Sequence, residues 1–120
     1  MSAQTLAANA TGSQLPIPSA QTLILAAKLA QQQDKPLMLD YYADSVLKKA
    51  FLGIDKETGD KILLKNRDEF TSLIKKVNRT GPNETDDLLV QTENSIYIVT
   101  GSIDKKHIAA TKLLAESDEF

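Results

Sequence analysis

The chain of 120 residues contains no cysteine, no tryptophan and a single histidine. Without cysteine it has no thiol nucleophile, no disulfide, and no zinc or iron–sulfur site built on thiolates. Any catalytic triad or imidazole-based metal site would have to centre on His107. That residue stands beside Lys106 and Ile108, and a histidine without such partners is typical of a surface or partly packed position. We therefore expect no metal site.

The sequence also lacks the glycine-rich and nucleophile motifs of common enzymes: no P-loop, no G-x-G-x-x-G and no G-x-S-x-G. Asp40 and Asp44 would share one face of a helix and could form an acid–base or cation site, if that segment were helical. Solvated turn carboxylates are the commoner outcome. We expect a protein that is not an enzyme and has no cofactor.

Long apolar runs are absent too. No stretch approaches the roughly 18 residues of a membrane span, and the N-terminus has no basic region of the kind that begins a signal peptide. The expectation is a cytoplasmic protein without a membrane span.

Charge and aromatic content both argue against a dedicated nucleic-acid-binding protein. The formal net charge is −2 and aromatic residues make up 5% of the chain, so there is neither a strong positive field nor a stacking platform. The basic residues include three pairs, Lys48-Lys49, Lys75-Lys76 and Lys105-Lys106. If these pairs converged they could contact phosphates, but acidic residues interleave with them, which favours a mixed solvated surface.

The N-terminal quarter has a different composition from the rest. Residues 1–18 carry no charged side chain and end in Leu-Pro-Ile-Pro, which predicts a flexible, extended arm that folds, if at all, on a partner. Ser19 is a candidate N-cap for a helix over Ala20–Gln33. That helix is apolar around most of its circumference and has Lys28 as its one charge, so it is either packed in its own core, which we favour, or covered by another chain. The candidate partner-binding residues are Leu15, Ile17, Leu23, Ile24, Leu25 and Leu29.

Beyond Asp34 the pattern predicts alternating short elements. Period-two alternation and turn residues indicate two hairpins, and spacing at i, i+3, i+4 and i+7 indicates a helix containing Phe70, Leu73, Ile74 and Val77. The predicted elements are a strand over Leu37–Tyr42, a hairpin of Lys49–Ile54 and Lys61–Lys65, a helix over Asp68–Val77, a hairpin of Leu88–Thr92 and Ser95–Thr100, and a helix over Lys105–Glu116.

This order of elements predicts an α+β fold: a small, mostly antiparallel sheet of two hairpins with helices packed on it, plus the N-terminal arm. The length fits one domain, which we place at residues 19–120, after an arm at residues 1–18.

Three stretches resemble small proteins of nucleocytoplasmic large DNA viruses: Asp34–Tyr42, Lys61–Lys65 with Asp68–Ser72, and Thr92–Val99. The resemblance has no diagnostic motif and carries over no catalytic residue. It implies a small virion or assembly protein, located in the virion, for which an uncharged arm is suited. The order of helices and hairpins is also similar to that of roadblock and profilin-like scaffolding modules, by topology alone.

Three functional hypotheses follow. The favoured one is a non-enzymatic structural or interaction protein that docks into a larger homo- or hetero-oligomeric assembly through its arm and apolar helix. The alternative is a regulatory module that binds nucleic acid or a ligand through the lysine pairs. The third is an enzyme with a carboxylate site at Asp40 and Asp44.

Overall fold

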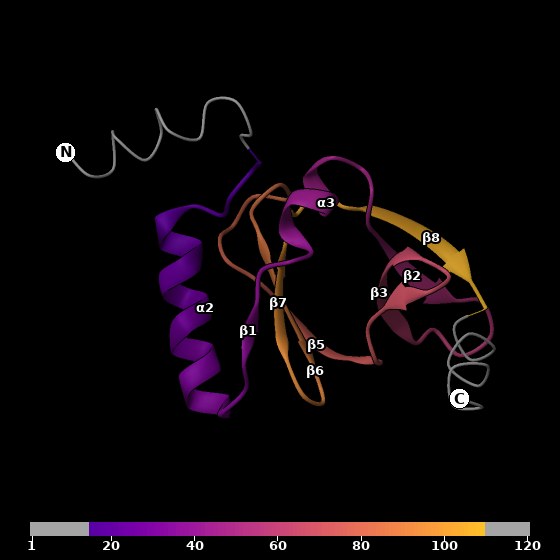
Figure 1. Cartoon of the computed structure of the whole chain (residues 1–120), viewed down its shortest axis with the longest axis horizontal. Helices are drawn as coiled ribbons and strands as arrows, with labels where there is room; N and C mark the ends of the chain where they lie inside the picture. The colour runs from indigo at the N-terminus through magenta and orange to yellow at the C-terminus, as the bar shows by residue number, and fades with distance from the viewer. Residues whose placement is uncertain (1–14, 110–120) are drawn as a thin grey trace.

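A computed structural model of the chain describes residues 15–109. In that part the protein has two helices and eight short strands (Figure 1). The helices are α2 (Ala20–Gln33) and α3 (Tyr42–Val46), and the strands are β1 (Leu37–Met38), β2 (Phe51–Asp55), β3 (Lys61–Asn66), β4 (Glu69–Phe70), β5 (Ile74–Arg79), β6 (Leu88–Thr92), β7 (Ile96–Val99) and β8 (Asp104–Ile108).

The strands form two four-stranded sheets of similar construction. The first sheet has the order β1-β7-β6-β5 and the second β4-β3-β2-β8. In each, three strands are antiparallel and one edge strand is parallel to its neighbour: β1 to β7, and β8 to β2. The α+β class is therefore confirmed. The expected single, mostly antiparallel sheet is wrong, because there are two sheets, both are mixed, and strand residues outnumber helical ones.

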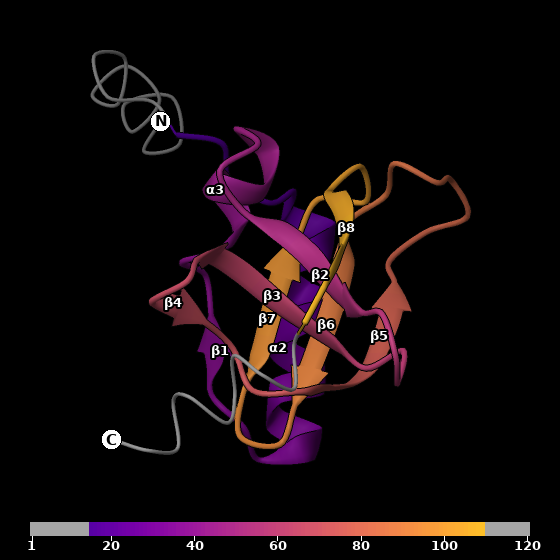
Figure 2. The ribbon, with the colours of Figure 1, turned by 90° about the vertical axis from the view of Figure 1, so that its right-hand side faces the viewer.

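The structure has three layers, with α2 on one side, the first sheet in the middle and the second sheet on the other side (Figures 1 and 2). Apolar side chains from the facing surfaces of the two sheets, and from the connections beside them, make the larger core; its buried members are Tyr41, Ala50, Leu52, Leu63, Leu88, Val90, Val99 and Ile103. A smaller core lies between α2 and the opposite face of the first sheet, centred on Ala26, Leu89 and Ile98. Alternate residues of β6 and β7 thus enter different cores, as the period of a strand requires.

The predicted helix at Ala20–Gln33 is confirmed, including its N-cap. The Ser19 hydroxyl accepts a hydrogen bond from the Thr22 backbone N–H at 3.1 Å, which satisfies one of the free donors of the first turn. The helix ends at Asp34, whose left-handed backbone (φ 53°) lets its N–H bond back to the last turn. Both predicted hairpins are also confirmed, as β2–β3 and β6–β7.

The helix predicted over Asp68–Val77 is wrong, because this segment forms β4 and β5. The Asn66 side chain accepts a hydrogen bond from the Asp68 N–H at 2.8 Å and closes a tight turn between β3 and β4. Thr71 then joins the chain to β3: its N–H donates to the Leu63 carbonyl at 2.9 Å, and its hydroxyl accepts from the Leu63 N–H at 3.0 Å. These contacts to another strand outweigh the local helical spacing.

Two other predicted elements need correction. The start of the helix predicted over Lys105–Glu116 is wrong, since Asp104–Ile108 forms β8 along the free edge of β2; residues 110–116 lie outside the described range. The strand predicted over Leu37–Tyr42 is only two residues long, and α3 begins at Tyr42. Of the predicted arm, residues 1–14 lie outside the described range as well.

Replacing Thr71 with valine should destabilise the protein by about 1–3 kcal/mol, because the buried Leu63 N–H would lose its partner while the packed volume stays the same. Urea denaturation measures the change. The exposed neighbour Ser72→Ala is the control and should change stability by less than about 0.5 kcal/mol. Equal stability of Thr71→Val and the unmodified protein would contradict this account of the β3–β4 connection.

Candidate binding groove

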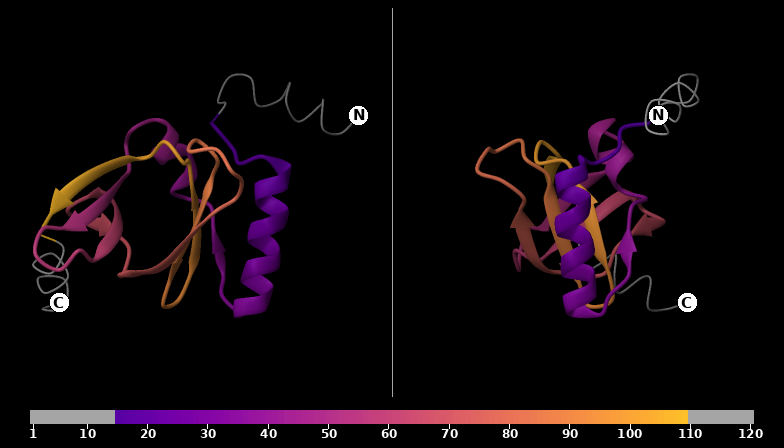
Figure 3. Two further views of the ribbon diagram at one scale, coloured as in Figure 1. Left: turned by 180° about the vertical axis from the view of Figure 1, so that it is seen from behind. Right: turned by 90° about the vertical axis from the view of Figure 1, so that its left-hand side faces the viewer.

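A groove of about 910 Å³ runs between α2 and the strands β5 and β6. It forms because α2 packs across the middle of the first sheet, against Leu89 of β6 and Ile98 of β7, and leaves β5 to its side (Figure 3, right). The residues that line it are Leu25, Lys28, Leu29, Gln32, Gln33, Lys35, Lys75, Lys76, Asn78, Arg79, Thr80, Leu89 and Gln91.

The lining of the groove is strongly basic although the protein as a whole is acidic. Five of the lining residues are lysine or arginine and none is aspartate or glutamate, whereas the whole chain has a formal net charge of −2. The cations come from three places in the sequence: Lys28 on α2, Lys35 after it, and Lys75, Lys76 and Arg79 on β5. Concentrating one sign of charge in a concave site raises the local potential and attracts the opposite charge.

Three of these cations already have partners. The Lys75 ammonium lies 2.5 Å from a Glu93 carboxylate oxygen, and its hydrogen bond and charge lower the pKa of that carboxyl. Lys35 donates to the Thr92 carbonyl at 2.8 Å. Arg79 donates to the backbone carbonyls of Glu84 and Asp86 and so braces the loop after β5.

Lys28 and Lys76 also line the groove, but without such partners. Both side chains are exposed, and neither makes an ion pair with any residue in the described part of the chain. They stand on opposite walls, one on α2 and the other on β5. These two ammonium groups are the ones available to an incoming anion.

The floor of the groove is apolar and neutral. Leu25 and Leu29 of α2 are half-buried against Leu89 of β6, and the Gln91 side-chain amide donates to the Asn78 side-chain oxygen at 3.2 Å. A ligand with both acidic and apolar groups would match this surface.

A partly buried carboxylate fixes α2, and with it one wall of the groove, to the sheet. Asp87 accepts hydrogen bonds from the Thr22 hydroxyl at 2.9 Å and from the Tyr42 hydroxyl at 3.1 Å. Burial raises the pKa of Tyr42 to about 12, and the charge and hydrogen bond of Asp87 act in the same direction. The phenol is thus held protonated as a donor.

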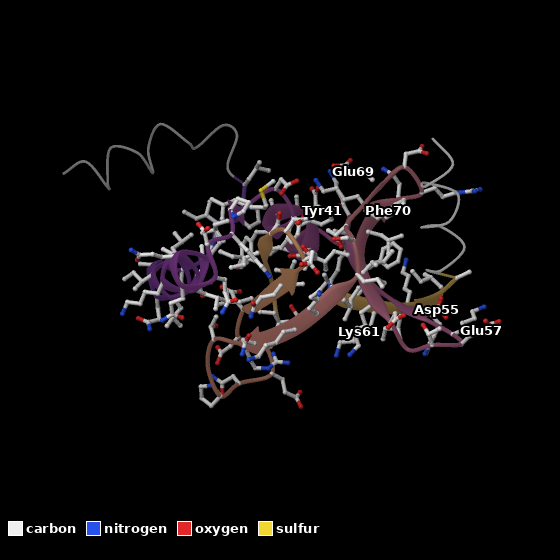
Figure 4. All side chains as sticks on the ribbon, turned by 90° about the horizontal axis from the view of Figure 1, so that it is seen from below. Tyr41, Asp55, Glu57, Lys61, Glu69 and Phe70 are labelled. Atoms are coloured by element: carbon white, nitrogen blue, oxygen red, sulfur yellow. The ribbon has the colours of Figure 1, made fainter. Side chains whose placement is uncertain are left out.

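A second polar cluster lies on the other side of the molecule, between α3 and the second sheet (Figure 4). The Lys65 ammonium is 3.1 Å from Asp44 and 3.3 Å from Glu69, and it lies 4.6 Å from the centre of the Tyr41 ring. Burial lowers the pKa of Lys65, but the hydrogen bonds and charges of Asp44 and Glu69 outweigh it, so the net shift is upward. Burial, followed by the charge of Glu69, raises the pKa of Tyr41.

The direction of these shifts is the opposite of what nucleophilic or base catalysis requires, because a reactive lysine or tyrosine needs a lowered pKa. The cluster instead joins three elements: α3 through Asp44, β3 through Lys65 and β4 through Glu69. Asp44 is thus half of an ion pair, while Asp40 is exposed and forms no ion pair with a described residue. We interpret this cluster as a structural brace.

The structure divides the six candidate partner-binding residues into three groups. Leu25 and Leu29 line the groove, and Leu23 packs toward Ala26 in the smaller core. Leu15, Ile17 and Ile24 are exposed, and the Ile24 side chain is 52% exposed. The apolar helix therefore serves its own core on one side and presents apolar surface on another.

Of the three lysine pairs only Lys75-Lys76 lines the groove. Lys48 pairs with Asp104 at 3.4 Å, and Lys106 lies 4.5 Å from the Phe51 ring on the second sheet. His107 is exposed on β8. Lys28, Lys35 and Arg79 could not be identified as groove residues from the sequence, because nothing in their local pattern shows which strand lies beside the helix.

Among residues 15–109, no group of three or more histidine, aspartate and glutamate side chains is arranged to hold a metal ion. Within the same range, no helix has both the length and the apolar character that crossing a membrane requires. No protein-family model matches the sequence, and comparisons with curated proteins and with solved structures found no match.

The Tyr42 phenol makes stability depend on alkaline pH. In the unfolded chain the phenol ionises near pH 10, but in the folded protein only near pH 12, so it stays protonated to a higher pH when the protein is folded. The stabilisation is complete below pH 10 and is lost as the pH rises from 10 to 12. Tyr42→Phe, which keeps the ring, should show a shallower loss of stability over this window in urea denaturation. An identical pH dependence for both proteins would contradict the assignment.

Proposed function

We propose that the protein is a non-enzymatic interaction protein that binds an acidic segment of a partner protein in the groove between α2 and β5. The observation that carries this proposal is the charge of the groove: five cations and no acid, on a protein of net negative charge. Charge complementarity of this kind selects partners and accelerates their association.

A polypeptide is favoured over a nucleic acid by what else lines the groove. None of the lining residues is aromatic, so bases would have no stacking surface, while Leu25, Leu29 and Leu89 supply apolar contacts that a phosphate backbone cannot use. Three of the five cations are also occupied by Glu93 or by backbone carbonyls, which leaves few charges for a run of phosphates.

The role expected from the sequence, docking into a larger assembly, is kept, but the surface proposed for it is smaller. Instead of the whole apolar helix and the arm, the proposed docking surface on α2 is the side that carries Leu25, Lys28 and Leu29. The exposed Leu15, Ile17 and Ile24 extend the same helix and its lead-in, and would add contacts with a larger partner. If the resemblance to small viral proteins holds, that partner is another virion subunit.

Reversing the two available charges should abolish recognition of an acidic probe. We expect a labelled peptide of alternating valine and glutamate, VEVEVEV, to bind the protein, and Lys28→Glu/Lys76→Glu to weaken binding at least about tenfold, which corresponds to about 1.4 kcal/mol. Fluorescence anisotropy at about 0.1 M salt measures the dissociation constants, and higher salt should weaken binding further.

The matched control is Lys49→Glu/Lys56→Glu, which changes the net charge equally at two exposed lysines outside the groove. It should leave peptide affinity within about twofold. Equal weakening by both double variants would show that only net charge matters. Binding of oligothymidine but not of VEVEVEV would favour the nucleic-acid alternative over the proposed function.

A further inference from the structure

The wall of the groove opposite α2 is the open edge of a sheet. β5 pairs with β6 and has no strand on its other side in the part of the chain that the structure describes. Figure 2 shows β5 at the rim of the first sheet. An open edge of this kind can accept an additional strand from another polypeptide.

The hydrogen-bond pattern shows which backbone groups of β5 point outward. The Thr80 N–H donates to the Asp87 carbonyl at 2.9 Å, and the register pairs Arg79 with Leu88 and Val77 with Val90. Because bonded and non-bonded pairs alternate in an antiparallel ladder, the backbone groups of Val77 and Arg79 point away from β6.

The neighbouring ladder supports this assignment. The Thr92 N–H donates to the Ser95 carbonyl at 2.9 Å, so Val90 and Leu88, which lie two and four residues before Thr92, bond toward β7. Their partners on β5 therefore have no backbone bond from β6. The N–H and C=O of Val77 and Arg79 are the groups that an added strand would meet.

The side chains of β5 differ in character on its two faces. Lys76 and Asn78 lie opposite Gln91 and Leu89, on the face that α2 and the groove share. Val77 lies opposite Val90, a residue of the core between the sheets, yet its side chain is 39% exposed at the rim. An added strand would thus place alternate side chains beside lysines and beside an exposed valine.

We propose that the acidic segment binds as an added β-strand along β5, with acidic side chains toward Lys76 and Lys28 and apolar side chains beside Val77. This inference depends on the proposed function and specifies its partner: an extended segment in which acidic and apolar residues alternate. The same lysines repel a second copy of β5, since two such edges would bring like charges together.

Peptide backbones methylated at alternate amides test the strand geometry. An N-methyl group removes a donor and blocks an edge, so of two VEVEVEV peptides, one methylated at its valines and one at its glutamates, we expect one to lose binding at least about tenfold. The other should bind like the unmodified peptide, because its methyl groups face solvent. Loss with methylated valines indicates an antiparallel strand, and loss with methylated glutamates a parallel one.

Val77→Pro provides the reciprocal test on the protein. Proline removes an N–H that β6 does not use, so the sheet should persist, as circular dichroism and urea denaturation would verify. The variant should lose affinity for VEVEVEV. The control Val77→Thr keeps the N–H and the β-branched shape and should bind normally.

The results of these experiments distinguish strand addition along β5 from the proposed function, binding of an acidic segment, on which it depends. If VEVEVEV binds, the groove charge reversal weakens it, and both methylated peptides bind like the unmodified one, the strand geometry is wrong while the proposed function stands. If VEVEVEV does not bind at all, both fail, and the lysines of β5 only protect the edge from association. If Val77→Pro unfolds the protein, the methylated peptides alone decide.

Discussion

The apolar layer shared by the two sheets determines the rest of the structure. Leu52 and Leu63 from the second sheet pack against Leu88, Val90 and Val99 from the first. Because one face of the first sheet packs in this layer, the apolar residues of its other face must be buried by another element. Among residues 15–109, α2 is the only helix longer than five residues. A single helix covers part of a four-stranded sheet, and the groove opens beside that helix, along β5 and the adjoining side of β6.

The position of α2 is set by polar contacts as well as by apolar ones. Asp87, in the strand connection before β6, receives hydrogen bonds from Thr22 at the start of α2 and from Tyr42 at the start of α3. A partly buried carboxylate with two donors is a specific anchor, because either donor alone would leave it less satisfied. The side of α2 that carries Lys28 therefore has a fixed position relative to β5, and the proposed recognition can depend on where individual charges stand as well as on total charge.

The two sides of the molecule use charge differently. On the second sheet, the charges of Lys65, Asp44 and Glu69 neutralise one another at short range and stabilise the fold. In the groove, Lys28 and Lys76 form no ion pair with a described residue, so the free energy of their neutralisation is available to a ligand. This contrast is the physical reason why we propose binding at the groove and interpret the cluster at Tyr41 as structural.

Local signals in the sequence were sufficient for α2 and for both hairpins. Ser19 caps a run of helix formers, and each hairpin combines alternation with turn residues, so each of these elements is specified by its own residues. Local signals were insufficient for Asp68–Val77 and Asp104–Ile108. These segments form strands because of their contacts with Leu63 and with the edge of β2, which are distant in sequence. Leu25 and Leu29 were identified as contact residues from apolar spacing, but the groove was not, because Lys28, Lys35 and the β5 lysines converge only in the folded chain.

The most direct test of the account is backbone amide exchange, measured by NMR with and without the VEVEVEV peptide. We expect the amides of Val77 and Arg79, which point outward, to gain protection from exchange when the peptide is added. The protection of the Asn78 amide, which is already bonded to β6, should change little. Protection that appears on α2 alone, with the β5 amides unchanged, would contradict strand addition. No protected amide on either wall would contradict binding in the groove.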